Sequence, residues 1–127
     1  MMKTVDIGRL GERAASKYLK KNGYKLVASN AHFSHNEIDI IAKDKEYIVF
    51  VEVKTRSTDE NMSYKYGTPA SAVTKAKQQR TLDAARAYLR SGKYRTLQPR
   101  FDVIEVHLNK DDNSILEINH ITNAFGA

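Results

Sequence analysis

Cysteine and long apolar runs are both missing from this sequence, and each absence excludes a class of protein. Without cysteine the chain has no disulfide, no zinc-thiolate site and no thiol nucleophile. No segment approaches the roughly 18 apolar residues of a membrane-spanning helix, and the opening residues MMKTVDIG lack the apolar core of a signal peptide. Internal repeats, linkers and low-complexity tracts are absent as well. The sequence therefore predicts a soluble, cytoplasmic protein that makes no use of a membrane.

Positive charge is what the composition has in excess. The 21 lysines and arginines outnumber the 15 acidic residues and give a net charge of +6. Such a balance favours a polyanionic partner, of which nucleic acid is the commonest. The length of 127 residues predicts a single domain, spanning residues 1–127, with one substantial core.

The stretch from residue 37 to residue 54 carries the clearest chemical signal. It is typical of two strands joined by a tight turn. Its second half, residues 47–53, is apolar and rich in β-branched and aromatic residues, as in a central strand. Each strand nevertheless holds a carboxylate, Asp39 in the first and Glu52 in the second. Since side chains alternate between the two faces of a sheet, Lys54 shares the face of Glu52.

The turn decides whether these carboxylates meet. Residues 43–46 are polar and suit a hairpin loop of two or four residues. Either length is expected to pair Asp39 with Phe50, which places Asp39 diagonally across from Glu52, roughly 7–8 Å away between backbones. A three-residue loop would put the two carboxylates on opposite faces. The site hypothesis therefore depends on a loop with an even number of residues.

Two carboxylates that converge repel each other, and a divalent cation removes that conflict. Oxygen ligands of this kind suit Mg²⁺, with Mn²⁺ as an alternative, because Mg²⁺ takes only one or two carboxylates from a protein. Lys54 adds a positive charge that could stabilise a phosphate during its reaction. Asp39, Glu52 and Lys54 together predict metal-assisted hydrolysis of a phosphodiester.

Apolar periodicity elsewhere predicts two amphipathic helices and three more strands. The helices are expected at residues 6–22 and 74–90, the strands at residues 24–31, 101–108 and 114–122, and a long polar loop at residues 55–68. The order of elements is then αβββαββ, which indicates an α/β or α+β fold with a mixed central sheet flanked by helices. Asp102 and Glu105 fall on opposite faces of the fourth strand, and we interpret them as structural or solvated.

Cationic side chains gather on the first helix, in the long loop and at the start of the second helix, where the helix dipole gives cations no help. The candidate nucleic-acid contacts are Arg9, Arg13, Arg56, Lys65, Lys75, Lys77, Gln78 and Arg80. A solvated loop explains the loop residues almost as well, and for the second helix a solvated face is the first interpretation and a phosphate contact the second.

Glu12 and two histidines complete the set of candidates. Glu12 lies at the edge of the apolar stripe of the first helix, where a glutamate that solvates the helix is the simpler interpretation. His32 and His35 have no cysteine partners and lack the i, i+4 spacing of helical metal ligands. We interpret them as loop histidines that could touch a substrate.

Five short motifs together resemble the uncharacterised bacterial YraN-like family. They are GxxGERAA at positions 8–15, EIDII at 37–41, FVEVKxR at 50–56, RFD at 100–102 and NHIxNAF at 119–125. The likeness covers nearly the whole chain. That family is similar to the PD-(D/E)xK nuclease superfamily, most closely to archaeal four-way-junction resolvases and restriction-type endonucleases, and it implies a restriction-endonuclease-like core. One departure is Asn36, where these relatives commonly have glycine, although asparagine tolerates unusual backbone angles.

The resemblance assigns roles to individual positions. Asp39 matches the first acidic residue of the nuclease motif, and Glu52 and Lys54 match its (D/E)xK pair. Glu12 matches the helix glutamate that supports the metal site of the resolvases. Val53 would offer its backbone carbonyl to the metal, beside the carboxylates of Asp39 and Glu52. The oligomeric state stays open, with a homodimer implied by the junction-cutting relatives, which act as dimers.

These observations support three hypotheses. The leading one is a Mg²⁺-dependent DNA endonuclease with branched DNA as a candidate substrate. The second is a nucleic-acid-binding or assembly module of a recombination, repair or DNA-uptake pathway, because a nuclease-like core need not cut. In the third, the basic surface serves a protein partner or ribosomal RNA, and the carboxylates hold a structural ion.

Overall fold

Five strands and two helices make up the computed structural model, which describes residues 6–33, 36–58 and 73–126. The elements follow in the order α1 (Ile7–Lys21), β1 (Lys25–Phe33), β2 (Asn36–Lys43), β3 (Tyr47–Thr58), α2 (Lys75–Leu89), β4 (Gln98–Asn109) and β5 (Ile115–Phe125). The strands form one sheet in the order β1-β2-β3-β4-β5, in which β3 and β4 run parallel and all other neighbours antiparallel. The mixed α+β architecture and the order αβββαββ are those predicted from the sequence.

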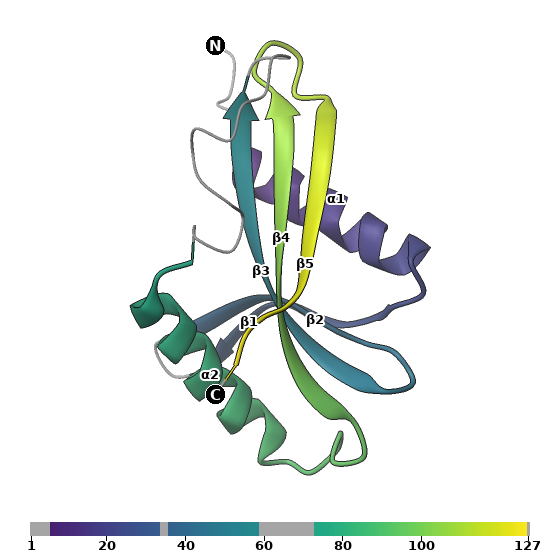
Figure 1. The fold of residues 1–127 in the computed structure, drawn as a ribbon, viewed down its shortest axis with the longest axis vertical. Coiled ribbons are helices and arrows are strands. Elements are labelled where there is room, and N and C mark those ends of the chain that lie inside the picture. Colours follow the sequence, from purple (N-terminus) through teal and green to yellow (C-terminus); the bar gives the residue numbers. More distant parts are fainter. Residues whose placement is uncertain (1–5, 34–35, 59–72, 127) are drawn as a thin grey trace.

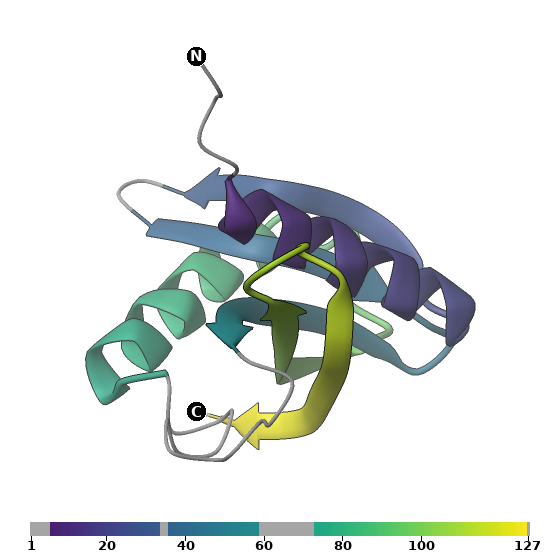
Figure 2. The same ribbon diagram turned by 90° about the horizontal axis from the view of Figure 1, so that it is seen from above.

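Each helix covers one face of the sheet (Figures 1 and 2). Leu19 of α1 is fully buried in a cluster with Val49 and Val51 of β3. Leu82 of α2 belongs to a second cluster, on the other face, with Phe50 of β3. The alternation of side chains along β3 therefore divides the core into two layers. No helix in the described ranges has both the length and the apolar composition to cross a bilayer.

Both helices begin and end as their sequences indicate. Asp6 caps α1 by accepting a hydrogen bond from the backbone nitrogen of Arg9 at 3.2 Å, and Thr74 caps α2 in the same way through the nitrogen of Lys77 at 3.2 Å. Gly23 follows α1 with a φ of 91°, a left-handed conformation that glycine adopts without strain.

The strands extend further than the sequence predicts. β3 continues to Thr58 because it pairs in parallel with β4 as far as Asn109, so residues 55–58 are strand and the prediction of a loop there is wrong. His32 lies in β1 and not in a loop, because β1 pairs with β2 through Phe33. The remainder of the predicted loop, with Lys65, and the histidine at position 35 lie outside the described residues.

Gly11 lets α1 approach β3 closely. A Cβ atom at this position would lie 1.8 Å from Oγ1 and 2.9 Å from Cβ of Thr55. Gly11→Ala should therefore lower the free energy of unfolding by about 1–3 kcal/mol, the cost of overpacking, although alanine favours helices. Gly8→Ala is the matched control, since its nearest neighbour is the Asp6 carboxylate at 3.3 Å. Urea denaturation checks both, and a Gly11→Ala protein as stable as the Gly8→Ala protein would contradict the close packing.

Candidate active site

The two halves of the sheet separate between β2 and β3. Their pairing runs from Lys43 opposite Ile48 to Ile40 opposite Val51. Beyond that last pair β2 stays with β1, and β3 stays with β4, so the strands diverge, as Figure 1 shows. We call this point the fork. The first residues beyond it are residue 39 on β2 and residues 52–54 on β3, the positions of the predicted site.

The hairpin between β2 and β3 has an even loop, as the site hypothesis required. Lys45 and Glu46 form the loop, which is closed by a hydrogen bond from the nitrogen of Asp44 to the carbonyl of Tyr47 at 3.1 Å. The Asp44 carboxylate also accepts from the nitrogens of Glu46 at 2.8 Å and Tyr47 at 2.7 Å. These bonds fix the turn one residue later than the centre assumed from the sequence.

The register at the fork corrects one prediction. Phe50 pairs with Ile41, not with Asp39 as expected, so the prediction is wrong by two residues. Because the shift is even, Asp39 and Glu52 still share a face. Continuing the register by one residue puts Asp39 opposite Glu52 across the fork, in place of the diagonal position that the sequence predicts.

Asp39 takes over a hydrogen bond that the sheet leaves unmade at the fork. Its Oδ2 accepts from the backbone nitrogen of Val53 at 2.8 Å. Since the N–H and C=O of one strand residue point to the same side, the carbonyl of Val53 also points toward the β2 side. The predicted backbone ligand therefore faces the side on which Asp39 lies.

The carboxyl groups of Asp39 and Glu52 lie close enough for each to alter the pKa of the other. Burial, reinforced by the negative charge of Asp39, raises the pKa of Glu52 to about 7. Burial likewise raises the pKa of Asp39, against the opposing effects of the Val53 N–H and the charge of Lys77. Near neutral pH Glu52 is therefore partly protonated, although the charge of Lys77 favours its ionised form.

This donor set fits a hard divalent cation. Within residues 6–33, 36–58 and 73–126 no three acidic or histidine side chains are grouped tightly enough to hold a metal by themselves. A cation at the fork would therefore be held by two carboxylates and a backbone carbonyl. So few protein ligands suit Mg²⁺, which usually keeps several water molecules in its coordination shell.

Glu12 approaches the fork from α1. Burial and the charge of Asp39 raise the pKa of Glu12, which places the two carboxylates within electrostatic reach. The amide of Asn30 lies between Glu12 and Glu37, and the orientation that turns its nitrogen toward these carboxylates lets it donate to Oε2 of Glu12 at 3.3 Å and to Oε1 of Glu37 at 3.0 Å. Asn30 adopts a left-handed φ of 49° in β1, which asparagine tolerates better than most residues. The sequence reasoning missed Asn30 and Glu37 as site residues, although alternation put Glu37 on the face of Asp39.

The raised pKa of Glu52 predicts how stability depends on pH in metal-free buffer. Between the ordinary value of 4.5 and about 7, the folded protein binds more protons than the unfolded chain. The free energy of unfolding should therefore fall as pH rises through this window, by up to about 1.4 kcal/mol per pH unit from this one group. Glu52→Gln should flatten the fall, and Glu46→Gln at the exposed hairpin tip should leave it unchanged. Urea denaturation at several pH values decides; an unaltered slope in Glu52→Gln would contradict the assignment.

The predicted phosphate contacts lie in different settings. Arg9 and Arg13 line a hollow of about 350 Å³ together with Glu12 and Asn30, next to the fork. Lys75 and Arg80 are exposed on the first turns of α2, so they can reach a ligand. None of these contacts is tested by the structure.

Three other predicted contacts are engaged within the protein. Lys77 Nζ lies 3.8 Å from Oε2 of Glu52. Gln78 donates its side-chain nitrogen to the carbonyl of Val73 at 3.0 Å. Arg56 is only 22% exposed, with Nε 3.9 Å from Oε2 of the buried Glu105.

Asp102 and Glu105 on β4 are both buried. Of the two interpretations given above, the structural one therefore holds and the solvated one is wrong.

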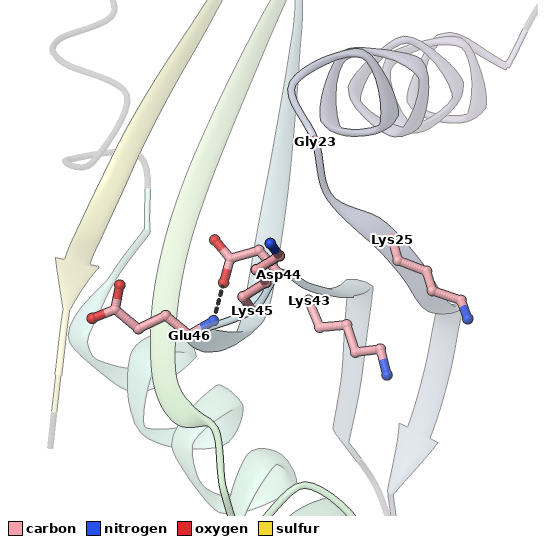
Figure 3. A pocket seen from close by; sticks show the side chains of 6 residues that line it. All are labelled: Gly23, Lys25, Lys43, Asp44, Lys45 and Glu46. Carbon is pink, nitrogen blue, oxygen red and sulfur yellow. Dashed lines mark hydrogen bonds between the residues drawn. The ribbon is translucent and has the colours of Figure 1, made fainter.

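A second hollow, of about 500 Å³, lies at the far end of the β2–β3 hairpin (Figure 3). Its lining residues are Gly23, Lys25, Lys43, Asp44, Lys45 and Glu46. None of the predicted site residues lines this hollow, although its volume is larger than that of the hollow beside Glu12.

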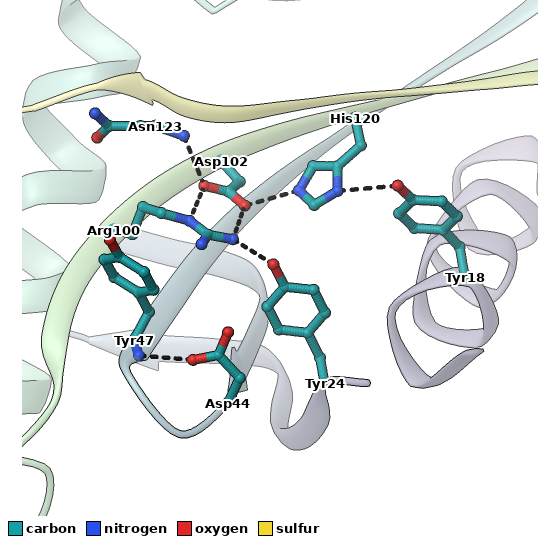
Figure 4. Close-up of polar contacts among 8 residues, drawn as sticks. All are labelled: Tyr18, Tyr24, Asp44, Tyr47, Arg100, Asp102, His120 and Asn123. Carbon is teal, nitrogen blue, oxygen red and sulfur yellow. Dashed lines mark hydrogen bonds and ion pairs between the residues drawn. The ribbon is translucent and has the colours of Figure 1, made fainter. Parts of the chain in front are cut away.

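A buried polar network holds α1 against the sheet (Figure 4). Asp102 on β4 is fully buried and accepts two hydrogen bonds from Arg100, at 2.9 and 2.8 Å, and one from His120 at 2.7 Å. His120 also contacts the hydroxyl of Tyr18 on α1 at 3.2 Å, and Arg100 donates to the hydroxyl of Tyr24 at 2.7 Å. Burial alone would raise the pKa of Asp102, but the bonds from His120 and Arg100 outweigh it and lower that pKa.

A model of the uncharacterised protein family UPF0102 matches residues 11–106 of this chain. The chain belongs to the UPF0102 family. A UPF0102 protein of Caldanaerobacter subterraneus subsp. tengcongensis is 44% identical over 119 residues, which cover 94% of this chain and 93% of that protein. A UPF0102 protein of Clostridium botulinum strain Kyoto is 45% identical over 121 residues, 94% of each chain. The resemblance to the YraN-like family is thereby confirmed.

Among solved structures, SfsA of Pyrococcus furiosus in complex with Ca²⁺ is similar, with a TM-score of 0.39 and 11% sequence identity. The match covers 91% of this chain and 63% of that chain.

Proposed function

We propose that this UPF0102 protein is a divalent-metal-dependent DNA endonuclease whose active site is the fork. The observation that carries the proposal is the half-buried pair of Asp39 and Glu52, two carboxylates that meet at the fork and whose pKa values are raised by burial. A Mg²⁺ or Mn²⁺ ion held by these carboxylates and the Val53 carbonyl would supply Lewis-acid stabilisation of a reacting phosphate. The resemblance of the EIDII and FVEVK motifs to PD-(D/E)xK nucleases supports the same reaction.

The protein residues have separate tasks in this proposal. Asp39 and Glu52 hold the cation, and the hydrogen bond from Val53 keeps Asp39 in place. Lys54 follows Glu52 on the same face and stabilises negative charge on the phosphate. Glu12 adds negative charge from α1 and supports the metal site at its edge. Arg9, which is 83% exposed on its side chain, meets the backbone of the nucleic acid beside the fork.

Branched DNA is the substrate to test first. The decisive experiment offers labelled duplex, single-stranded, flap and four-way-junction DNA to the purified protein with Mg²⁺ or Mn²⁺. Glu52→Ala is run beside it. Cleavage of one substrate that disappears in Glu52→Ala supports the proposal and names the substrate.

A second function is favoured by one contact. The ammonium of Lys77, 3.8 Å from Glu52, already balances part of the negative charge without a metal, as a site that never binds one would require. The chain would then bind nucleic acid without cutting it. DNA binding that weakens steeply with salt, is unaffected by Glu52→Ala and is accompanied by no cleavage with either metal would establish this alternative.

A further inference from the structure

Lys77 stands apart from the other cations at the start of α2. Its side chain is 30% exposed and reaches into the fork, with Nζ 3.8 Å from Oε2 of Glu52. Lys75 and Arg80, on the same first turns of the helix, are exposed instead. A cation that binds the phosphates of an external ligand would point outward, as Lys75 and Arg80 do. That role therefore does not explain why the side chain of Lys77 turns inward.

The position of Lys77 is electrostatically unfavourable within its own helix. The first turn of a helix carries the positive end of the dipole, and α2 has no acidic residue there to compensate. The backbone nitrogen of Lys77 is fixed by its hydrogen bond to Thr74, so the residue belongs firmly to this turn. Its ammonium is therefore held by the carboxylates of the sheet and not by α2.

Lys77 interacts with both members of the carboxylate pair. Among the described residues, the charged groups that act most strongly on Glu52 are Asp39 on β2, Lys77 on α2 and Lys54 on β3. The charge of Lys77 also lowers the pKa of Asp39, against the effect of burial. A divalent cation bound by Asp39 and Glu52 would need the Glu52 carboxylate, whose Oε2 now faces this ammonium. Two cations that seek one pair of carboxylates compete.

We propose, building on the metal-dependent function above, that Lys77 is the counter-ion of the Asp39–Glu52 pair in the metal-free protein and is displaced when a divalent cation binds. The displaced ammonium then lies beside Lys54, where it contacts the phosphate of the substrate. The first turn of α2 thereby senses whether the metal is present, and Lys77 is an active-site residue in addition to the acid, acid and lysine of the motif.

The test compares Lys77→Met, which keeps the length of the stem and removes the charge, with Lys75→Met on the exposed side of the same turn. Mg²⁺ is titrated into each protein by calorimetry at about pH 8.5, where Glu52 is ionised. Lys77→Met should bind Mg²⁺ at least roughly fivefold more tightly than the parent protein, because a competing charge is gone. Lys75→Met should stay within about twofold, and Lys77→Arg, which retains the charge, should bind like the parent.

Cleavage separates this role from that of the carboxylates. At saturating Mg²⁺, Lys77→Met should cut at least roughly tenfold more slowly although it binds the metal more tightly. Glu52→Gln, in contrast, should lose both properties. Circular dichroism verifies that each variant is folded, and Lys77→Gln provides a second neutral variant if Lys77→Met is not.

The possible failures can be told apart. Parent protein that cuts DNA, together with a Lys77→Met variant whose Mg²⁺ affinity is equal or weaker, overturns the counter-ion role and leaves the nuclease standing. Tighter Mg²⁺ binding with an unchanged cleavage rate overturns the phosphate contact. Parent protein that neither binds Mg²⁺ nor cuts DNA overturns the proposed function and the role of Lys77 together.

Discussion

Lys54→Ala is expected to reduce DNA cleavage by at least about 100-fold while leaving Mg²⁺ affinity close to that of the parent protein. Lys54 follows Glu52 on the same face of β3, so in the proposed reaction its charge would act on the phosphate while the carboxylates hold the metal. Asp39→Asn and Glu52→Gln should instead weaken both metal binding and cleavage, because each removes a charged oxygen ligand. The rate of a single turnover on the preferred DNA, with calorimetric titration of Mg²⁺, measures the two effects separately.

Lys45→Ala provides the matched control for Lys54→Ala. Lys45 is exposed in the two-residue loop at the other end of the same hairpin, so its loss removes an equal charge far from the fork. Its cleavage rate should stay within about threefold of the parent rate, the change expected of a surface charge that only steers DNA. If Lys54→Ala, Asp39→Asn and Glu52→Gln all cut as fast as the parent protein, the site has been assigned to the wrong residues.

Asp102→Ala is expected to lower the free energy of unfolding by about 3–5 kcal/mol, the cost of breaking a buried ion pair by removing one partner. Asp102 is fully buried and accepts from Arg100, from His120 and from the backbone nitrogen of Asn123 at 2.9 Å. Without it the guanidinium of Arg100, 11% exposed, loses its counter-ion in the interior. Urea denaturation near neutral pH measures the loss.

Asp83→Ala is the control for this prediction. Asp83 lies on the exposed side of α2, 52% exposed, with Arg86 at 3.8 Å, and such surface pairs contribute at most about 1 kcal/mol. The network of Asp102 also reaches α1 through the hydroxyl of Tyr18. Asp102→Ala should therefore also reduce DNA cleavage, because α1 carries Glu12 and loses part of its anchorage to the sheet. Equal stability of Asp102→Ala and Asp83→Ala would contradict the structural role of the network.

The sequence was sufficient for the architecture because its local signals agree with one another. The apolar run of β3, the caps Asp6 and Thr74, and the asparagine and glycine after α1 each point to the element observed. Strand ends were predicted less well, because β3 continues through polar residues wherever β4 offers a parallel partner. Pairing over a long sequence separation is not visible in local propensity.

The arrangement of the candidate site was predictable where it depends on alternation along a strand, and not where it depends on packing. Asp39, Glu52 and Lys54 follow from the period of two along a strand, which survives a register error of two residues. The inward turn of Lys77, the bridge made by Asn30 and the burial of Arg56 depend on how α1, α2 and the sheet pack together. The sequence therefore predicted that the carboxylates share a face, and it gave Lys77 and Arg56 as nucleic-acid contacts or solvated cations without indicating their partners inside the protein.

Calorimetric titration of Mg²⁺ at about pH 8, where Glu52 is ionised, tests the central claim most directly, because it requires no knowledge of the DNA substrate. We expect saturable binding by the parent protein, weakened at least about tenfold, or roughly 1.4 kcal/mol, in Glu52→Gln and in Asp39→Asn. Lys45→Ala should bind as the parent does. Heat of binding that is absent from the parent protein, or unchanged in both carboxylate variants, would contradict the claim that the fork is a divalent-metal site.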